Sequence, residues 1–532
     1  MKSLPFLALT LLLATNPLKT CAEVKLPPVF SNHMVLQRQM PVPIWGTAAA
    51  GEKVTVKFRT QEKTAVADAQ GAWKVLLDPI EAGGPETLTV AGSNTLTFEN
   101  VLVGEVWVGS GQSNMAGAPT GYLPSATRPI NTKFSGDKNL EAIIKGAPYP
   151  QIRLLVGVGR ASWQEATPEN LGKFSALLQS FGIPLHKKLG VPVGLMVGAV
   201  GGTSSGCWLT PQALAEDAAC QQAIEKAKAT FNLEQAQAKG DKLLKQYETD
   251  LAAWNQLSEE QKKGKRAPNR PQMMVRPGES QHLIGSLYER HIRQFIGYAI
   301  RGVLWDQGES GTAINGVDQF TLMGALIRGW RKDWKQGDFP FLYVQKPSGG
   351  GCAYDPADPL FAWASEPFAP LPPAIPTDGA QRENHIKIAS YPSTFMVTAS
   401  DLGSGTHPAN KAGYGARAAQ VALGIVYGEK VATIGPVFAG HAVEGNKVRV
   451  RYTHVVQGLV FRGGDKLQGF ALAGADKVFS WADATIEGDG VVLSSAKVPT
   501  PVHVRYAWSN RHNWANLFNK DGLPAIPFRT DE

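Results

Sequence analysis

Cysteine is scarce in this sequence. Only four of the 532 residues are cysteines, and no Cys-x-x-Cys or His-x-x-x-His spacing occurs. Such spacings are the usual signs of a bound metal, so we expect no metal cluster. If Cys21 leaves with a signal peptide, Cys207, Cys220 and Cys352 allow at most one intramolecular disulfide, which excludes a disulfide-scaffold protein.

The excess of positive over negative charge is also small. The chain has 53 Lys and Arg against 45 Asp and Glu, a formal net charge of +8, and its one dense basic run spans only residues 262–270. A nucleic-acid-binding protein usually carries a stronger basic patch, so we expect no nucleic-acid partner. Because 43% of the residues are hydrophobic, the composition is that of a globular protein and excludes a disordered one.

Long apolar runs are missing except at the N-terminus. Lys2 precedes an apolar stretch from Leu4 to Ala14, and small residues stand at Thr20, Cys21 and Ala22. This pattern is typical of a secretory signal peptide, which we predict over residues 1–22, and its apolar core is too short to span a membrane permanently. No later segment offers 18 apolar residues without a charge. We therefore expect a mature protein that has no membrane span and is secreted or periplasmic.

The rest of the chain shows two kinds of sequence pattern. Residues 23–103 and 428–532 hold short runs rich in β-branched residues between turn signals, such as EKVTVKF and NKVRVRYTH, which predicts a β-sandwich at each end. In residues 104–427, apolar strands such as EVWVGSG and IRGVLWDQG alternate with helical stretches. We therefore predict an α/β protein with a central parallel sheet and crossover helices, flanked by N-terminal and C-terminal β-sandwich domains.

Two insertions interrupt the central region. Residues 211–265 are charged and helical, and an apolar stripe from Leu244 to Trp254 at helical spacing predicts a helical hairpin that closes on Gly240. Residues 347–379 form a long loop rich in proline and glycine. Loops of this length are usually functional lids or disordered segments.

Four polar blocks each follow a predicted parallel strand. They are SGQSN around Ser113, VGGT around Gly201 and Gly202, DQGES around Gln307 and Glu309, and SGTHP around His407. A serine on a glycine-flanked turn can act as a nucleophile, glycine amides and a glutamine can donate to an oxyanion, and a histidine can accept a proton. Each block alone has a simpler interpretation as a cap, a turn or a polar loop. Together, in this order, they predict a hydrolase site at the carboxyl edge of the sheet.

The blocks resemble those of the SGNH hydrolases, and their residue sequences are closer still to those of the sialate O-acetylesterase family. The segments that carry the resemblance are NHMVLQRQMPVPIWG, VGEVWVGSGQSNM, FSALLQSFGIPLHKKLGVPVGLMVGAVGGT, WDQGES, the Arg382-Glu383 pair, HPANKAGYGARAA, and VRYAWSN with GLPAIPFRT. They cover most of the mature chain.

The resemblance implies an SGNH-type central sheet and ester hydrolysis through an acyl-enzyme, without a cofactor. By position, Ser113 is the nucleophile and His407 the general base. The backbone N–H groups of Ser113 and of Gly201 or Gly202, with the side chain of Gln307, would form the oxyanion hole.

The third member of the triad is the main departure from the SGNH pattern. Those enzymes commonly have an acidic residue three positions before the histidine, where this chain has Ser404. Asp401 is the nearest acid in sequence and our first choice, with Glu309 or a Ser-His dyad as the alternatives. A second departure is LYERHI at residues 287–292, where relatives tend to carry an Asn-Gly pair.

The sequence leaves the substrate open. The leading hypothesis is a secreted carbohydrate O-acetylesterase that removes O-acetyl groups from sialic acids, with an O-acetylated sugar or glycan as its partner. Arg382 could then clamp the sialic acid carboxylate, or instead form a structural ion pair with Glu383. An acetylxylan or other polysaccharide acetylesterase would use the same blocks. A non-catalytic glycan-binding protein is the alternative from another class.

Overall fold

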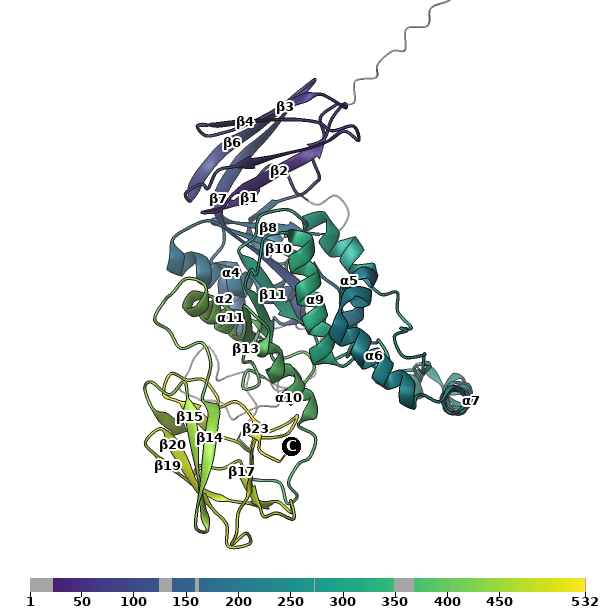
Figure 1. The fold of residues 1–532 in the computed structure, drawn as a ribbon, viewed down its shortest axis with the longest axis vertical. Coiled ribbons are helices and arrows are strands. Elements are labelled where there is room, and N and C mark those ends of the chain that lie inside the picture. The colour runs from purple at the N-terminus through teal and green to yellow at the C-terminus, as the bar shows by residue number, and fades with distance from the viewer. Residues whose placement is uncertain are drawn as a thin grey trace, which may run out of the picture.

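The computed structural model describes residues 23–123, 136–157, 162–271, 273–348, 368–403 and 405–531. The predicted signal peptide, most of the loop rich in proline and glycine, Ser404 and Cys352 lie outside the described residues. The N-terminal strands stand at the top of Figure 1, a sheet covered by helices lies in the middle, and the C-terminal strands lie at the bottom.

The central sheet is parallel apart from one edge strand. Its strand order is β13-β12-β11-β7-β10-β8-β9, and only β9 runs antiparallel to its neighbour, β8. The strands are β7 (Thr95–Gly111), β8 (Tyr149–Val156), β9 (Gln164–Ala166), β10 (Val193–Ala199), β11 (Gly302–Asp306), β12 (Phe341–Val344) and β13 (Thr394–Val397). The carboxyl ends of β7, β10 and β11 therefore meet at one edge, since Gly111 is in register with both Ala199 and Asp306.

Both faces of this sheet are buried, which explains why its strands are continuous apolar runs. Alternate residues contribute to opposite faces: Trp107 and Leu304 belong to one apolar cluster, Val108 and Val303 to the other. The first cluster lies under α4 (Ala176–Leu189) and α11 (Lys411–Ile425), which pack on each other. The second includes α9 (Gln319–Trp334), and near it lies α10 (Ala380–Lys387). The remaining short helices of this region are α1 (Ser113–Ala116), α2 (Lys138–Lys145) and α3 (Pro168–Leu171).

Strand β7 is shared between the central sheet and the N-terminal strands. Its first part pairs with β6 and β1, and from Glu105 onward it pairs with β10 and then β11. The N-terminal strands are β1 (Val35–Gln37), β2 (Val42–Thr47), β3 (Lys53–Phe58), β4 (Gln61–Val66), β5 (Ala72–Leu77) and β6 (Gly83–Ala91). Most of them therefore join the central strands in one eleven-stranded sheet, while β2 and β5 pair only with each other.

The C-terminal strands form antiparallel sheets around a core of their own. Two four-stranded sheets have the orders β14-β15-β20-β19 and β18-β17-β21-β23, and β16 pairs with β22. The strands are β14 (Val437–Glu444), β15 (Lys447–Thr453), β16 (Leu459–Phe461), β17 (Phe470–Ala473), β18 (Ser480–Trp481), β19 (Asp483–Glu487), β20 (Gly490–Ser494), β21 (His503–Tyr506), β22 (Leu517–Asn519) and β23 (Phe528–Arg529). The chain is thus a mixed α/β protein with one large mixed sheet and additional antiparallel sheets, as predicted at that level, while the division into three domains stays a prediction.

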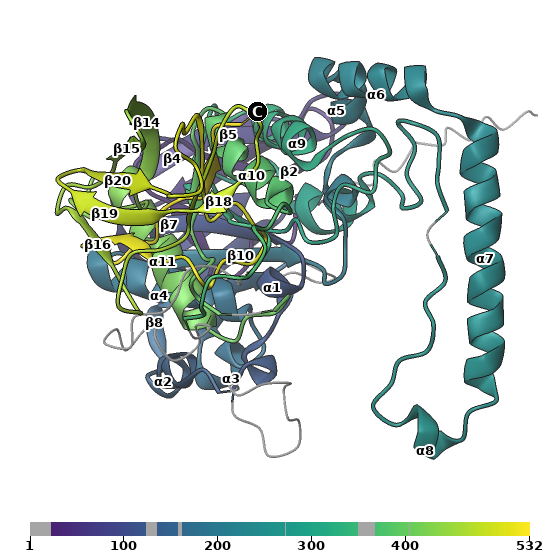
Figure 2. The same ribbon diagram turned by 90° about the horizontal axis from the view of Figure 1, so that it is seen from below.

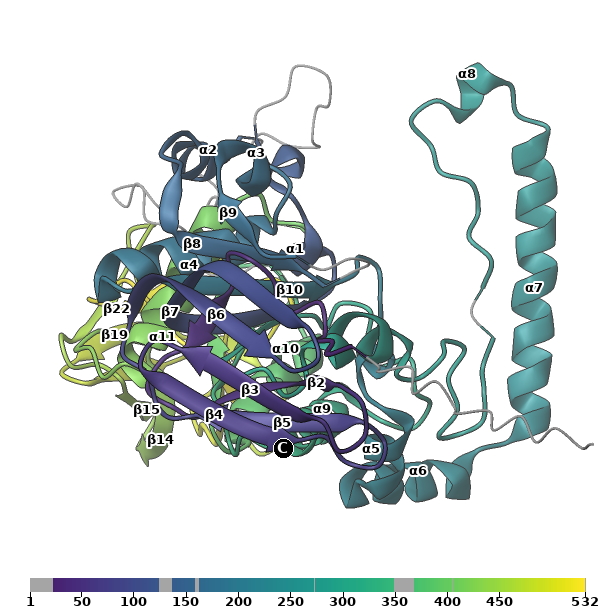
Figure 3. The ribbon, with the colours of Figure 1, turned by 90° about the horizontal axis from the view of Figure 1, so that it is seen from above.

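The helical insertion packs against the body at its base and projects from it at its outer end (Figure 2). It consists of α5 (Pro211–Glu216), α6 (Ala218–Thr230), α7 (Leu233–Asn255) and α8 (Glu259–Lys262). Figures 2 and 3 show α7 projecting from the body with α8 at its far end, and the chain returning beside it without helical structure. The predicted closing of a hairpin on Gly240 is wrong, because α7 runs through that residue. A helix tolerates one glycine at a cost of about 1 kcal/mol, and here the missing side chain leaves room for Met273 of the returning segment.

No helix among the described residues combines the length and the apolar character needed to cross a bilayer.

Candidate active site

The end of β7 presents Ser113 at the carboxyl edge of the sheet. Gly111, the last residue of β7, has φ +129°, and a Cβ atom there would lie 2.1 Å from the carbonyl oxygen of Asp306. Only glycine fits this close approach and this backbone conformation. The N–H of Gln112 then donates to that same carbonyl at 2.9 Å, which fixes the turn. Ser113 follows as the first residue of α1 and stays partly exposed.

Ser113 and His407 are brought together from positions 294 residues apart. The Oγ of Ser113 lies 2.7 Å from Nε2 of His407, the distance that proton transfer from a nucleophile to a general base requires. Burial lowers the pKa of His407 below its usual value, and nearby Lys411 lowers it further. His407 is therefore neutral and able to accept a proton at pH 7.

A buried chain of hydrogen bonds holds the His407 loop against α1. Nδ2 of Asn114 donates to the carbonyl oxygen of Thr406 at 2.9 Å, and Nζ of Lys411 donates to Oδ1 of Asn114 at 2.7 Å. Asn114 and Lys411 are fully buried. Burial lowers the pKa of Lys411 to about 7, and the aromatic ring of Tyr122 lies 4.7 Å from its nitrogen.

Beside these hydrogen bonds lies a buried charge cluster made of Asp306, Glu309 and Lys346. Nζ of Lys346 lies 2.5 Å from Asp306 and 2.8 Å from Glu309. Burial raises the pKa of Asp306, whereas the pKa of Glu309 is held at about 2, because Lys346 and its hydrogen bonds outweigh burial. Glu309 also accepts hydrogen bonds from Gln112 and from Ser348. Glu309 is therefore an ionised anchor for the residue that precedes Ser113.

The predicted oxyanion residues lie in two different settings. Gly201 faces the nucleophile, since a Cβ there would lie 3.3 Å from Cβ of Ser113, and Gly202 next to it has φ +72°. Among the described residues, no acceptor is bonded to the N–H groups of Ser113, Gly201 and Gly202. The side chain of Gln307 is turned elsewhere: its Nε2 donates to the carbonyl oxygen of Thr203 at 2.7 Å, and its Oε1 accepts from Ser205.

The structure does not bring Asp401 to the His407 ring. The carboxylate of Asp401 is engaged by Arg417 of α11, with Nη1–Oδ1 and Nη2–Oδ2 distances of 2.5 and 3.1 Å. Within the described part of the chain, Ser113 is the hydrogen-bond partner of His407, and no carboxylate lies within bonding distance of its Nδ1. Glu309 is nearby, yet its oxygens are taken by the partners described above.

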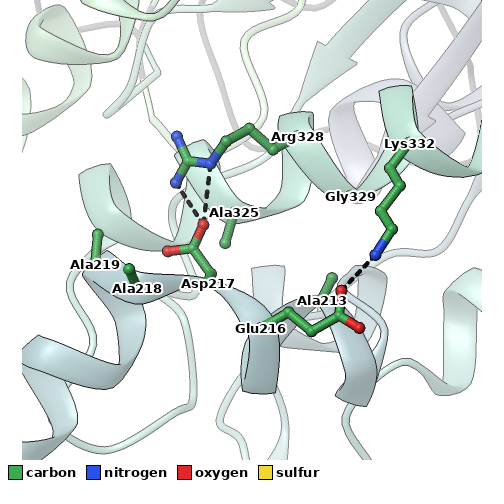
Figure 4. Close-up of a pocket in the computed structure, with 9 residues that line it drawn as sticks. All are labelled: Ala213, Glu216, Asp217, Ala218, Ala219, Ala325, Arg328, Gly329 and Lys332. Atoms are coloured by element: carbon green, nitrogen blue, oxygen red, sulfur yellow. Dashed lines mark hydrogen bonds and ion pairs between the residues drawn. The ribbon is translucent and has the colours of Figure 1, made fainter.

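Two cavities are candidates for the place where substrate binds. One, of about 200 Å³, adjoins the loop that carries His407: Thr406, the residue before His407, lines it together with Glu309 and Arg511 among others. The other, of about 470 Å³, lies between α5, α6 and α9 (Figure 4). There Arg328 is bonded to Asp217, and Lys332 to Glu216, so the charges of its lining are paired within the protein. The first cavity, which adjoins the loop that carries His407, is therefore the candidate space for substrate.

The described residues contain no group of three or more His, Cys, Asp or Glu side chains placed to hold a metal ion. The sequence motifs brought forward Ser113 and His407, but not Asn114, Lys346 or Lys411, which position them. Asn114 and Lys411 do lie inside the recognised segments SGQSN and HPANK. Lys346 has no such signal, because it stands one residue before the loop rich in proline and glycine, in no motif.

No family model matches the chain. A curated sialate O-acetylesterase from Homo sapiens is 26% identical over 543 residues, covering 94% of this chain and 91% of the relative, and one from Mus musculus is 27% identical over 539 residues, covering 93% and 92%. The crystal structure of a carbohydrate acetylesterase from Xanthomonas citri, 29% identical, aligns with a TM-score of 0.70 over 96% of this chain and all of that one. The resemblance that the sequence motifs predict is thereby confirmed.

Proposed function

We propose that this chain, which resembles the sialate O-acetylesterases along almost its whole length, is a carbohydrate esterase that removes O-acetyl groups from sugars by a serine mechanism. The observation that carries the proposal is the 2.7 Å contact between Ser113 Oγ and His407 Nε2 at the carboxyl edge of the sheet. The similarity to a carbohydrate acetylesterase over the full length of both chains supports the same activity.

The first half of the reaction forms an acetyl-enzyme. Ser113 Oγ attacks the acetyl carbonyl carbon while its proton passes to His407 Nε2. The tetrahedral intermediate then collapses, the bond from the carbonyl carbon to the sugar oxygen breaks, and His407 gives its proton to that oxygen. The sugar leaves with a free hydroxyl group.

The second half releases acetate. A water molecule gives a proton to His407 Nε2 and attacks the carbonyl carbon of the acetyl-serine. The bond to Ser113 Oγ then breaks as His407 returns the proton to it, which restores the enzyme. Each step moves one proton between oxygen and the same imidazole nitrogen, so the chemistry needs no residue other than His407 as acid or base.

The oxyanion is stabilised by backbone donors. The N–H groups of Ser113 and of Gly201 or Gly202 have no acceptor among the described residues and lie around the nucleophile. Gln307 contributes by holding the loop that carries the glycines, through its bonds to Thr203 and Ser205. Removing one donor from such a site costs about 3–4 kcal/mol of transition-state stabilisation.

For the substrate we propose O-acetylated sialic acids, in line with the curated relatives. We also propose that residues 1–22 are a signal peptide, so that the exported protein begins at Glu23, which N-terminal sequencing would read directly. An acetylxylan or other polysaccharide acetylesterase remains the second candidate, because the same residues would cleave its substrate.

The proposal is tested with p-nitrophenyl acetate, then with 9-O-acetyl-N-acetylneuraminic acid and acetylated xylo-oligosaccharides. Ser113→Ala should abolish hydrolysis, and His407→Ala should reduce kcat/KM by at least 10³-fold, with unchanged melting temperatures. Ser258→Ala and His282→Ala are matched controls, since both residues are exposed and lie outside the site. Wild-type protein that binds glycans but cleaves none of these esters would instead establish the non-catalytic alternative.

A further inference from the structure

The cavity at the His407 loop is built partly by the loop between β21 and β22. Thr406, Glu309 and Ser348 from the central region line one part of it, and Asn510 and Arg511 line another. Its volume of about 200 Å³ is below the range of about 300–1,000 Å³ of pockets that enclose drug-sized ligands. Such a space suits one substituent of a sugar held next to the catalytic pair.

The segment that carries Arg511 is fixed in place. Arg382 of α10 is 1% exposed, and its Nη2 and Nε donate to the carbonyl oxygens of Asn510 and Ser509 at 2.8 and 3.3 Å. Asp378 accepts a hydrogen bond from Oγ of Ser509, which in turn accepts one from the N–H of Arg511 at 3.1 Å. Arg382, considered from the sequence as a carboxylate clamp, is thus buried and holds the backbone of this loop.

Arg511 brings an uncompensated positive charge to the cavity. Its side chain is exposed, and within the described residues it forms no ion pair or hydrogen bond. Glu309, the carboxylate that shares the lining, is already paired with Lys346 at 2.8 Å. This wall of the cavity therefore offers an unpaired guanidinium group to whatever enters.

We propose that Arg511 binds the carboxylate of an anionic O-acetylated sugar and so determines specificity for acidic over neutral substrates. The inference rests on the proposed function, because it concerns the substrate of the same site. A guanidinium group matches a carboxylate with two parallel N–H···O bonds. Arg511 acts on binding alone and takes no part in proton transfer.

The test compares two substrates that differ by one charge: 9-O-acetyl-N-acetylneuraminic acid and its methyl ester, with acetate release as the measurement. We expect the wild-type enzyme to prefer the free acid. Arg511→Gln should lower kcat/KM for the free acid by about 10- to 100-fold, mainly through KM. It should leave kcat/KM for the methyl ester and for p-nitrophenyl acetate unchanged. For the free acid, the kcat/KM of Arg511→Lys should lie between those of the wild-type enzyme and of Arg511→Gln, because lysine keeps the charge but loses the paired geometry.

Arg451→Gln is the matched control, since Arg451 is an exposed arginine on β15 of the same C-terminal region. It should change none of the three rates. Equal wild-type rates on the acid and the methyl ester, or an Arg511→Gln loss that is the same on all three substrates, would overturn the role of Arg511 while leaving the esterase proposal intact. Wild-type enzyme that hydrolyses none of them would overturn both.

Discussion

At the residue scale, His407 works next to a buried ammonium group. Burial and Lys411 both lower the pKa of His407 from 6.5, and its neutral form is the active one. The kcat/KM for p-nitrophenyl acetate should therefore rise with pH through an inflection below 6.5. Glu309, with a pKa of about 2, stays ionised throughout and adds no inflection, whereas Lys411, with a pKa of about 7, loses its charge near neutral pH and adds a second inflection there. A profile without any inflection below pH 6.5 would contradict this electrostatic description.

The same profile separates the effect of Lys411 from that of burial. Lys411→Met keeps the length of the side chain and removes the charge, so the His407 inflection should move toward higher pH. Lys411→Met also breaks the bond to Asn114 Oδ1, so a lower kcat at the plateau should accompany the shift. A lower plateau without any shift would limit Lys411 to holding Asn114.

Asp401 is expected to act on stability more than on catalysis. Asp401→Asn removes the negative charge that faces the buried guanidinium of Arg417, and breaking a buried ion pair in this way costs about 3–5 kcal/mol. At a temperature where the variant is folded, kcat/KM should fall by less than about tenfold. A fall of several hundredfold at unchanged unfolding free energy would return Asp401 to the role that its sequence position first suggested.

These residues also show which parts of the site could be predicted from the sequence. Ser113 and His407 follow from their motifs, because strand-end serines and loop histidines have few structural uses in this order. The pairing of Asp401 with Arg417 could not be foreseen, since it depends on which face of α11 turns toward the loop. The same holds for Arg511, whose position near His407 depends on how the C-terminal sheets pack against α10.

At the scale of single elements, the end of β7 is the most constrained point of the site. Gly111→Ala would place Cβ against the carbonyl oxygen of Asp306 and force a left-handed backbone on alanine. Strain and overpacking together should lower the free energy of unfolding by about 2–5 kcal/mol, measured by urea denaturation. Gly121→Ala is the control, because a Cβ there meets nothing within 4 Å, and its unfolding free energy should stay within about 0.5 kcal/mol.

The extent of β7 was harder to predict than its existence. The runs NTLTFENVLV and EVWVGSG fall on the two sides of the boundary that we predict at residue 104, between the N-terminal β-sandwich and the central region, so they are predicted as two strands separated at Gly104. The glycine is needed inside the strand, because a Cβ there would lie 1.9 Å from the carbonyl oxygen of Pro192, which accepts the N–H of Glu105 at 2.9 Å. A close approach of neighbouring backbone and a turn leave the same mark in a single sequence.

At the scale of the whole molecule, the projecting arm should be dispensable for folding. Residues 241–272 include the outer part of α7 and all of α8, and Gly240 lies against Met273 at the base of the returning segment. The ion pairs of Arg328 with Asp217 and of Lys332 with Glu216 would still hold α5 and α6 to α9.

Replacing residues 241–272 by a four-residue Gly-Ser turn should therefore change the melting temperature by less than about 3 °C. It should also leave kcat/KM for p-nitrophenyl acetate within twofold of the parent. Loss of the folded state, or a change of molecular mass in solution, would show that the arm is part of the folding unit or of an assembly.

The shared strand β7 has a consequence for how the protein can be divided. A cut anywhere from Leu102 to Trp107 would sever backbone that is hydrogen-bonded to neighbouring strands. Both fragments would then expose unpaired strand edges. The N-terminal strands are therefore not a cassette that can be exchanged between relatives or expressed alone. Chimaeras with other enzymes should remain folded only when their junctions fall outside this strand.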